Sequence, residues 1–545
     1  MSENGTASFQ TNRRTAKVAG GLGLLLSAPL VSASYLAFKA FGVPFPAFEV
    51  FDWMARALPG PLVTFGIDSM VRVLVILGFN IKDTAKLAEQ MMAVFGFLVT
   101  AALVAGAYFY LIRTRLTARS LALGSYAGLL LGFPVVLITL DVYATATVEP
   151  LTGAAWLVLL FAAWGLALGW THLRSVGPAT APEEGESAAA PVRVKRISRR
   201  RFLVEIGGTA ATITVAGAGL ASYLRLTTEE IPLDTEPPIP PPNADSPVLP
   251  VEGTRPEYTP LREHYRIDIN TLPPRIDEAE WTLQIRGLVG NPLDLTLDDI
   301  RAYPSVQRFI TLGCISNPIG GPLISTTLWT GTRLSEILAA ADVDPRAQYV
   351  HVTSEDGFYE TIPLELLRSD DRIMLTYEFD GQPLPQEHGF PLRVWIPGRY
   401  GMKQPKWIIG LELTESDRPG YWVERGWSKE AIVNTTSVID TVVTDLIEET
   451  PAGPTVPVGG IAWAGDRGVT RVQVRADQGP WQDAQLREPL SDVTWVLWRY
   501  DWLFSPGEHT LEVRAQDGTG EWQTEARSGT YPDGATGLHE YEADL

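Results

Sequence analysis

Long apolar stretches dominate the first third of the chain. Four of them approach the ~20 residues that a membrane-spanning helix needs. A fifth apolar run, Leu62–Leu77, differs because Asp68 and Arg72 fall near its middle, where a charge that faces lipid costs about 2.5–3.5 kcal/mol. The pattern predicts a transmembrane helical region over residues 1–175, with four spans at Val18–Phe38, Met91–Ile112, Leu121–Leu140 and Ala154–His172.

The charges between these stretches predict their orientation. A cytoplasmic N-terminus places the basic segment Arg113–Arg119 inside and the acidic loop Asp141–Glu149 outside, provided that 62–77 does not cross. The very basic segment Arg193–Arg201 then also lies inside. A crossing at 62–77 would put both basic clusters outside. We therefore interpret 62–77 as a helix that lies on the outer face or re-enters from it.

Residues 176–202 are predicted to form a basic cytoplasmic linker. Its end, Ser198–Leu203, reads SRRRFL and leads into the moderately apolar run 203–224, a predicted fifth span. This arrangement resembles a twin-arginine export signal placed inside the chain, while a stop-transfer helix with basic flanks would give the same topology. Both interpretations predict a multi-pass plasma-membrane protein whose remaining part is extracytoplasmic. The Pro-rich residues 225–260 form a semi-stiff linker.

From Tyr265 onward the apolar positions form short strands with no regular strand–helix alternation, including WTLQIRGLV, RFITLGCI, QYVHVTS and PLRVWIP. One helix-like segment, LSEILAAA, interrupts them. This pattern predicts an α+β domain over 261–428. Beyond it the helical signals disappear, and alternating strands bounded by Gly, Pro and Asp predict an all-β immunoglobulin-like sandwich over 429–545.

Composition and charge exclude several function classes. The 545 residues contain one cysteine, so a disulfide within the chain or a cysteine-rich zinc or iron–sulfur site is excluded. Residues 225–545 carry a net charge of −25 against +6 for 1–224, which argues against a nucleic-acid partner. The predicted spans contain no pair of histidines and few ionisable groups. A bis-histidine haem is therefore excluded and a transporter is disfavoured, which leaves an anchor or docking surface.

Two segments carry candidate chemistry. Cys314 ends a strand and enters the polar loop GCISNPIGG. A lone cysteine is most often a small buried hydrophobe, and a Cys/His nucleophile would need one of the chain's six histidines nearby. Further along, five potential cations gather within nineteen residues of an otherwise acidic region. A solvated basic strand explains them, and so does a site for a phosphate-bearing cofactor. A third cluster, Arg262-Glu263-His264, says little by itself. The five cations are His388, Arg393, Arg399, Lys403 and Lys406.

Taken together, these segments resemble the sulfite oxidase family of molybdenum enzymes. The resemblance covers about 260–545 in order and continues through TLGCISN, TLWTGTRLSEIL, PLPQEHGFPLR and IPGRYGMKQPKW. The stretch GGIAWAGDRGVTRVQV resembles the start of the immunoglobulin-like dimerisation domain of the family. With its helical anchor, the whole chain most resembles the membrane-anchored bacterial branch.

The resemblance implies a molybdenum–molybdopterin cofactor and an oxidoreductase that transfers one oxygen atom. Cys314 would give a thiolate to molybdenum, beside two sulfurs from the pterin dithiolene. Arg262 would project towards the oxo pocket, and Trp427 stands where the family has an active-site tyrosine. Electrons would pass to a separate carrier, and the chain would form a homodimer. Residues that would hold the pterin and its phosphate are His264, Asn317, His388, Arg393, Arg399, Lys403 and Lys406.

Three positions depart from the animal sulfite oxidases. Pro318 and Ile319 stand where those enzymes have arginines, and Trp427 offers no acidic hydroxyl. Losing a cation weakens sulfite recognition, so a small oxyanion and an S- or N-oxide both remain as substrates. The same departures favour the alternative of a non-catalytic surface-binding protein with a degenerate molybdopterin domain.

Overall fold

The computed structural model divides the chain into two compact units. One comprises Met1–Ala57, Leu87–Ile231 and Asn270–Leu272, and the other Leu58–Lys86, Pro232–Ile269 and Pro273–Leu545. We describe each unit by itself. The residues described are 3–62, 65–66, 69–70, 73, 81–112, 119–142, 148–175, 207–217, 219–220, 239–451, 453–503 and 505–544.

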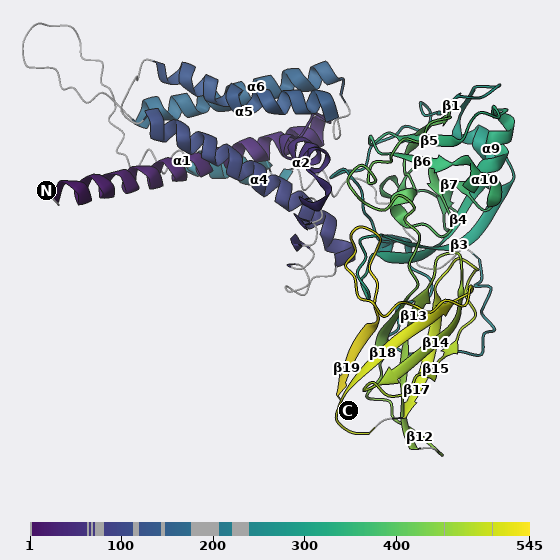
Figure 1. Cartoon of the computed structure of the whole chain (residues 1–545). Helices are drawn as coiled ribbons and strands as arrows, with labels where there is room; N and C mark the ends of the chain where they lie inside the picture. The colour runs from purple at the N-terminus through teal and green to yellow at the C-terminus, as the bar shows by residue number, and fades with distance from the viewer. Residues whose placement is uncertain are drawn as a thin grey trace, which may run out of the picture. The chain divides into compact units, whose positions relative to one another are not determined.

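The first unit is built from long helices (Figure 1). Among the described residues, four helical stretches are long and apolar enough to cross a membrane, namely Lys17–Phe41, Lys86–Ile112, Ser120–Asp141 and Pro150–Arg174. Each contains one of the four predicted spans. The helices are α1 (Glu3–Phe41), α2 (Pro46–Ala57), α4 (Ile81–Ile112), α5 (Ser120–Val142) and α6 (Pro150–Ser175).

Glycines let α5 and α6 pack closely. A Cβ atom on Gly128 would lie 2.2 Å from the carbonyl oxygen of Phe161, and one on Gly165 would lie 2.4 Å from that of Gly124. Neither position can carry a side chain without moving the opposite backbone. Small residues at a helix contact are the usual way in which apolar helices approach each other where lipid offers no hydrophobic driving force.

Some predicted segments fall beyond the part of the chain that the structure describes. The basic linker 176–202 with its twin-arginine-like motif lies outside the described residues. The run 62–77 is described only at a few positions. Of the predicted fifth span 203–224, residues 207–217 and 219–220 are described, and they are helical.

In the second unit, residues 283–414 form two sheets with short helices. One sheet has the order β2-β1-β10-β5-β6, in which β1 and β10 are parallel, and the other has the order β3-β4-β7-β8 with β9 paired to β7. Strand β5 alternates between half-buried and buried residues, the period of two that its sequence YVHVTS predicts. The elements are β1 (Leu283–Gly287), β2 (Leu293–Leu295), α8 (Leu297–Arg301), β3 (Ser305–Gly313), β4 (Ile324–Arg333), α9 (Leu334–Ala340), β5 (Tyr349–Ser354), β6 (Tyr359–Pro363), α10 (Leu364–Ser369), β7 (Met374–Phe379), β8 (Gln382–Pro383), β9 (Arg393–Trp395) and β10 (Ile408–Thr414).

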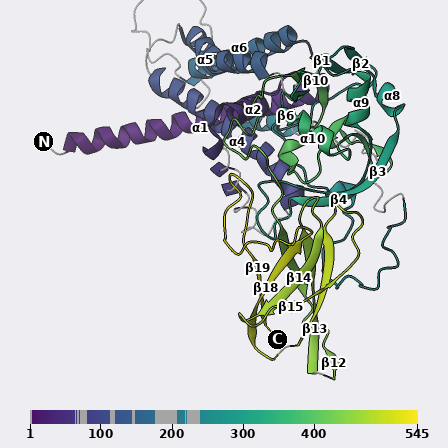
Figure 2. The ribbon, with the colours of Figure 1, turned by 45° about the vertical axis from the view of Figure 1, so that its right-hand side comes forward.

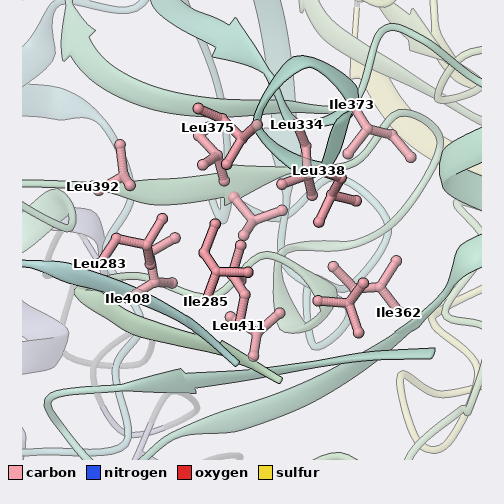
Figure 3. Packing of buried hydrophobic residues seen from close by; sticks show 14 of the residues in the cluster. Leu283, Ile285, Leu334, Leu338, Ile362, Ile373, Leu375, Leu392, Ile408 and Leu411 are labelled. Carbon is pink, nitrogen blue, oxygen red and sulfur yellow. The ribbon is translucent and has the colours of Figure 1, made fainter. Parts of the chain in front are cut away.

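One hydrophobic core joins both sheets and the helices. Ile285 of β1, Leu411 of β10 and Leu375 of β7 are almost completely buried in it, and α9 contributes Leu334 and Leu338 (Figure 3). Each such side chain contributes roughly 1.5–3 kcal/mol by its burial. This core fixes β9 and β10, whereas Ile310 and Leu312 of β3 pack with Cys314 in a separate cluster.

The C-terminal region contains two further antiparallel sheets, β11-β13-β17-β16 and β15-β14-β18-β19 (Figures 1 and 2). Val458, Trp498, Val474 and Val513 come from both sheets and share one core, so the region is rich in β-structure as predicted. Its strands are β11 (Thr436–Val442), β12 (Glu448–Thr450), β13 (Gly453–Trp463), β14 (Val469–Ala476), β15 (Gln482–Asp483), β16 (Gln485–Leu486), β17 (Val496–Leu503), β18 (Glu508–Asp517) and β19 (His539–Asp544).

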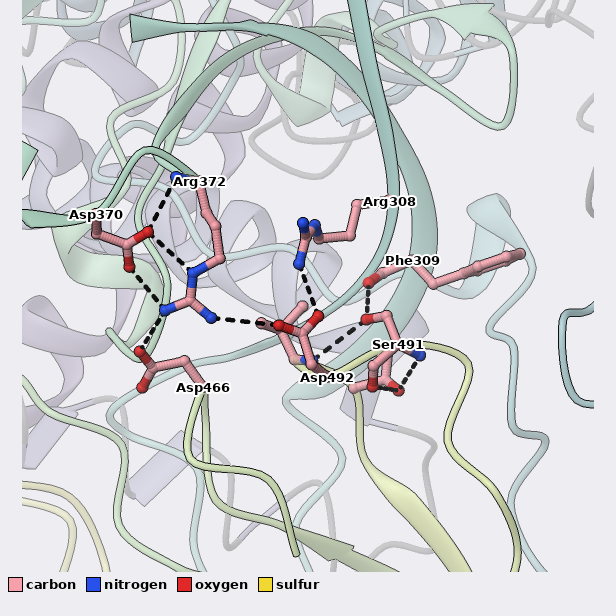
Figure 4. A network of polar contacts seen from close by, with 9 residues as sticks. Arg308, Phe309, Asp370, Arg372, Asp466, Ser491 and Asp492 are labelled. Atoms are coloured by element: carbon pink, nitrogen blue, oxygen red, sulfur yellow. Dashed lines mark hydrogen bonds and ion pairs between the residues drawn. The ribbon is translucent and has the colours of Figure 1, made fainter. Parts of the chain in front are cut away.

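A polar network ties this C-terminal region to the preceding domain (Figure 4). Arg372 donates to Asp370 beside it at 2.7 Å and to Asp466, which follows β13, at 2.9 Å. Asp492 of the C-terminal region accepts from Arg308 at 2.6 Å and pairs with Arg372 at 3.3 Å. Each pair is partly exposed, so the network matters more for holding the two parts in register than for stability.

Candidate active site

Cys314 lies where β3 ends and a tight loop begins. Its N–H donates to the carbonyl of Leu323 at 2.9 Å, and its own carbonyl accepts from the N–H of Asn317 at 3.0 Å. The amide oxygen of Asn317 accepts from the N–H of Leu323 at 2.8 Å, which closes the loop. The Cys314 side chain is 8% exposed and its Sγ lies 3.0 Å from Oγ of Ser316. Burial raises the pKa of the Cys314 thiol.

The cysteine lines a cavity of about 950 Å³, its open mouth included. Concave, largely apolar sites that contain a few polar groups are where proteins usually bind small molecules and cofactors. One side of the cavity carries imidazole and cationic groups, and another side is largely aromatic. Four of the predicted cofactor residues line it, although they come from positions 264 to 406: His264, His388, Arg393 and Lys406.

Two imidazoles and a guanidinium form the basic side. The rings of His264 and His388 lie 5.0 Å apart between centroids, and burial, with some contribution from His264 and Arg393, holds the pKa of His388 well below its usual value. Arg393 donates from Nη1 to the carbonyl of His388 at 2.9 Å and lies over the ring of Trp329 at 4.7 Å. Its Nε is buried with no hydrogen-bond partner among the described residues. Burial lowers the pKa of Arg393 to about 10.

Lys406 is held by a carboxylate that sequence reasoning missed. Its ammonium contacts Asp268 and lies over the ring of Trp407 at 4.4 Å from the centroid. Asp268 has a fully buried side chain and also accepts from Arg266 at 2.5 Å. No local signal in the sequence singles out Asp268, because the contact with Lys406 joins residues 138 positions apart.

The aromatic side of the cavity includes the other predicted catalytic position. Trp427 is 7% exposed and lies against Trp422, whose ring centroid is 6.3 Å away. Phe358 and Met402 also line this side. Trp422, Phe358 and Met402 were not predicted as site residues, since isolated aromatic and methionine positions normally indicate packing.

The structure does not bring the other predicted residues to this cavity. Arg262 has a 63% exposed side chain that pairs with Glu263 at 3.7 Å. Asn317 holds the cysteine loop and lines a separate cavity on which Cys314 also borders. Arg399 and Lys403 line a third cavity and pair with carboxylates there. The roles given to these four residues by resemblance stay predictions.

Part of the chain is similar to known oxidoreductases. Residues 270–422 match the model of the oxidoreductase molybdopterin binding domain. The uncharacterized oxidoreductase YuiH of Bacillus subtilis is 33% identical over 151 residues, which cover 28% of this chain and 74% of that protein. The chain belongs to the sulfite oxidase family of molybdenum-dependent oxidoreductases. The predicted family is thereby confirmed.

Two other members of this group show the extent of the similarity. Human mitochondrial sulfite oxidase is 30% identical over 289 residues, covering 45% of this chain and 53% of that enzyme. Azospira oryzae YedZ1, named as a candidate protein-methionine-sulfoxide reductase subunit, is 31% identical over 153 residues, covering 28% and 56%. The chain therefore spans about half the length of the mitochondrial sulfite oxidases that it matches.

The family uses a molybdenum–molybdopterin cofactor, as the sequence predicted. The residues around the cavity fit such a group. A buried guanidinium nitrogen that has no partner in the described part of the chain suits an anionic ligand. Two imidazoles, an ammonium group and a buried sulfur atom line the same cavity. Thiolate is a ligand that suits a soft redox metal.

Proposed function

We propose that this protein is a membrane-anchored, extracytoplasmic molybdopterin oxidoreductase that exchanges one oxygen atom with a small substrate and two electrons with a separate carrier. The observation that carries the proposal is that Cys314 shares one cavity with His264, His388, Arg393 and Lys406. Such a convergence of one sulfur and several donors from distant segments suits a large anionic chelate that brings its own metal.

Each side chain has a role in this proposal. Cys314 would supply the protein ligand to molybdenum. Arg393 and Lys406 would balance the negative charge of the pterin phosphate, and the two histidines would hydrogen-bond the pterin. The bound cofactor supplies the two-electron redox chemistry. Trp422 and Trp427 would exclude water from the reacting side of the cavity, where a low dielectric strengthens each polar contact.

The cavity favours an uncharged substrate over sulfite. All the cations that line it, Arg393 and Lys406, are those needed by the cofactor, and Arg262 is directed to solvent. Pro318 and Ile319 add no charge to the cysteine loop. We therefore propose a small S- or N-oxide as the substrate class, reduced as R2SO + 2e⁻ + 2H⁺ → R2S + H2O. Oxidation of a small oxyanion is the alternative.

We also propose on which side of the membrane the catalytic domain lies and how it assembles. Four apolar helices support attachment to a bilayer, and the distribution of basic loops supports an extracytoplasmic catalytic domain. The C-terminal sheets would act as an immunoglobulin-like dimerisation domain. Protease digestion of intact spheroplasts tests the orientation, since a cytoplasmic catalytic domain would be protected.

Turnover of the full chain in detergent tests the function. Protein from a molybdenum-replete, export-competent host should contain molybdenum and pterin, and should oxidise a reduced viologen dye when dimethyl sulfoxide, methionine sulfoxide or trimethylamine N-oxide is added. The matched assay adds sulfite and ferricyanide. Cys314→Ser should remove both turnover and molybdenum. Turnover of sulfite alone would reverse the proposed substrate class, and protein without molybdenum or pterin would contradict the whole proposal.

A further inference from the structure

A buried ion pair lies behind the aromatic side of the cavity. Glu360 of β6 is 1% exposed, and its Oε1 accepts from Nζ of Lys403 at 2.7 Å and from the N–H of Thr361 at 2.8 Å. Its other oxygen, Oε2, is buried with no hydrogen-bond partner in the described part of the chain. A buried carboxylate with one oxygen lacking a hydrogen bond stabilises a fold poorly. Stability alone therefore does not explain this pair.

Three segments that line the cavity of Cys314 meet at this pair. Glu360 follows Phe358 by two residues, and Lys403 follows Met402 directly. The third segment is the loop around Gly420, where a Cβ atom would lie 2.2 Å from Oε1 and 2.5 Å from Oε2 of Glu360. The backbone of the loop therefore lies directly on the carboxylate.

The same loop carries both cavity tryptophans. The N–H of Tyr421 donates to the carbonyl of Tyr359 at 2.9 Å, which fixes the loop beside β6. The N–H of Trp427 donates to the carbonyl of Trp422 at 3.0 Å. A shift of Gly420 would thus move both indole rings together.

Lys403 does not line the cavity of Cys314. It lies in the 3₁₀ turn Gly401–Lys403, in which Met402 faces the cavity of Cys314 and Lys403 lines a different one. Its ammonium group is directed at Glu360. The pterin contact that the resemblance implies for Lys403 stays a prediction.

We infer that the Glu360–Lys403 pair is a positioning device that holds the aromatic wall of the cavity, defined as Phe358, Met402, Trp422 and Trp427. Neither residue lines the cavity of Cys314. The pair sets how far the wall stands from Cys314, and hence which substrates fit. The effect on substrate choice rests on the proposed function, whereas the effect on the position of the wall does not.

The sole cysteine provides a test that needs no cofactor. The full chain, purified in detergent from a host that makes no molybdopterin, is treated with a thiol-reactive disulfide reagent, and the rate of Cys314 modification is measured. Glu360→Gln keeps the shape of the side chain but removes its charge. We expect modification to become about tenfold faster, the factor that a charged hydrogen bond of ordinary strength would give.

Glu512→Gln is the matched control, because Glu512 of β18 also pairs with a cationic side chain, Arg475 of β14, at 2.7 Å. It should leave the rate unchanged. Gly420→Ala disturbs the wall from the loop side and should also accelerate modification, which keeps the test decisive if Glu360→Gln does not fold. Unchanged rates in Gly420→Ala, and in Glu360→Gln where it folds, would overturn the inference.

Kinetics of the cofactor-loaded chain separate positioning from general destabilisation. Glu360→Gln should raise KM for the bulkier of two S-oxides while kcat and molybdenum content stay near the parent values, and Glu360→Asp should restore part of the loss. A uniform fall in kcat with lost molybdenum would contradict positioning. If the chain holds no molybdenum at all, the proposed function fails, and the modification rates still decide this inference.

Discussion

Arg393→Met separates what the fold needs from what the cofactor needs. The guanidinium is buried, and among the described residues its contacts are one hydrogen bond to the carbonyl of His388 at 2.9 Å and the ring faces of Trp329 and Phe379. Its Nε has no hydrogen-bond partner among those residues. Methionine has a similar length and no charge, so the substitution removes the cation with little loss of volume.

The expected change in stability can be worked from the pKa. Burial lowers the pKa of Arg393 from its usual value to about 10, and at 1.36 kcal/mol per pKa unit the charged form costs the folded state about 3 kcal/mol. This cost is fully present at pH 7 and fades as the pH rises through the folded-state pKa. Methionine removes it but loses a charged hydrogen bond of about 1.5–3 kcal/mol and a cation–π contact of about 1–2 kcal/mol. The net change should be under about 2 kcal/mol.

Cofactor retention should respond far more strongly. Removing one partner of a buried charge contact costs about 2–5 kcal/mol, which is about 30-fold or more in retention. Urea unfolding of the metal-free chain and molybdenum content of the loaded chain measure the two effects. Arg393→Lys is the control that keeps a charge. A metal-free Arg393→Met chain destabilised by more than 3 kcal/mol, or one that retains molybdenum fully, would refute the reasoning.

Three further predictions concern other parts of the molecule. Gly128→Leu should separate α5 from α6 and cost about 1–3 kcal/mol or more, seen as a lower thermal midpoint in detergent, whereas Gly96→Leu, which meets nothing within 4 Å, should change little. Asp268→Asn leaves two cations beside a neutral group and should cost the metal-free chain about 3–5 kcal/mol in urea unfolding; a cost below 1 kcal/mol would show that the carboxylate is dispensable. The pKa of folded His388 lies well below its usual value, so the unfolded chain binds a proton at this residue more readily than the folded chain. The free energy of unfolding should therefore fall below about pH 6.5, by up to about 1.4 kcal/mol per pH unit from this residue. His388→Gln should flatten the fall in unfolding free energy between about pH 6.5 and 5.5, and an unchanged slope would exclude His388 as its source.

The long apolar helices and the strands were predictable because each depends on a local pattern. A run of twenty apolar residues has few alternatives to a spanning helix, and the alternation in YVHVTS sets one face of β5. The close packing of α5 against α6 could not be predicted from their glycines, because the contact between Gly124 and Gly165 forms only when both helices are in place.

The candidate site was predictable only in part, because closeness in sequence is not closeness in space. Five cations within nineteen residues suggested one basic cluster. The chain turns at Gly398, whose φ is +66°, and the following 3₁₀ turn directs Lys403 away from the side on which Lys406 lies. Asp268 and Glu360 were not predicted as site residues, because the lysines that they pair with are distant in the sequence.

The most direct test of the account is X-ray absorption at the molybdenum edge of the loaded full chain. Cys314 as a ligand predicts three sulfur neighbours of molybdenum, one from the protein and two from the dithiolene, and any metal retained by Cys314→Ser should have two. Three sulfur neighbours in both proteins would contradict ligation by Cys314, and with it the central claim.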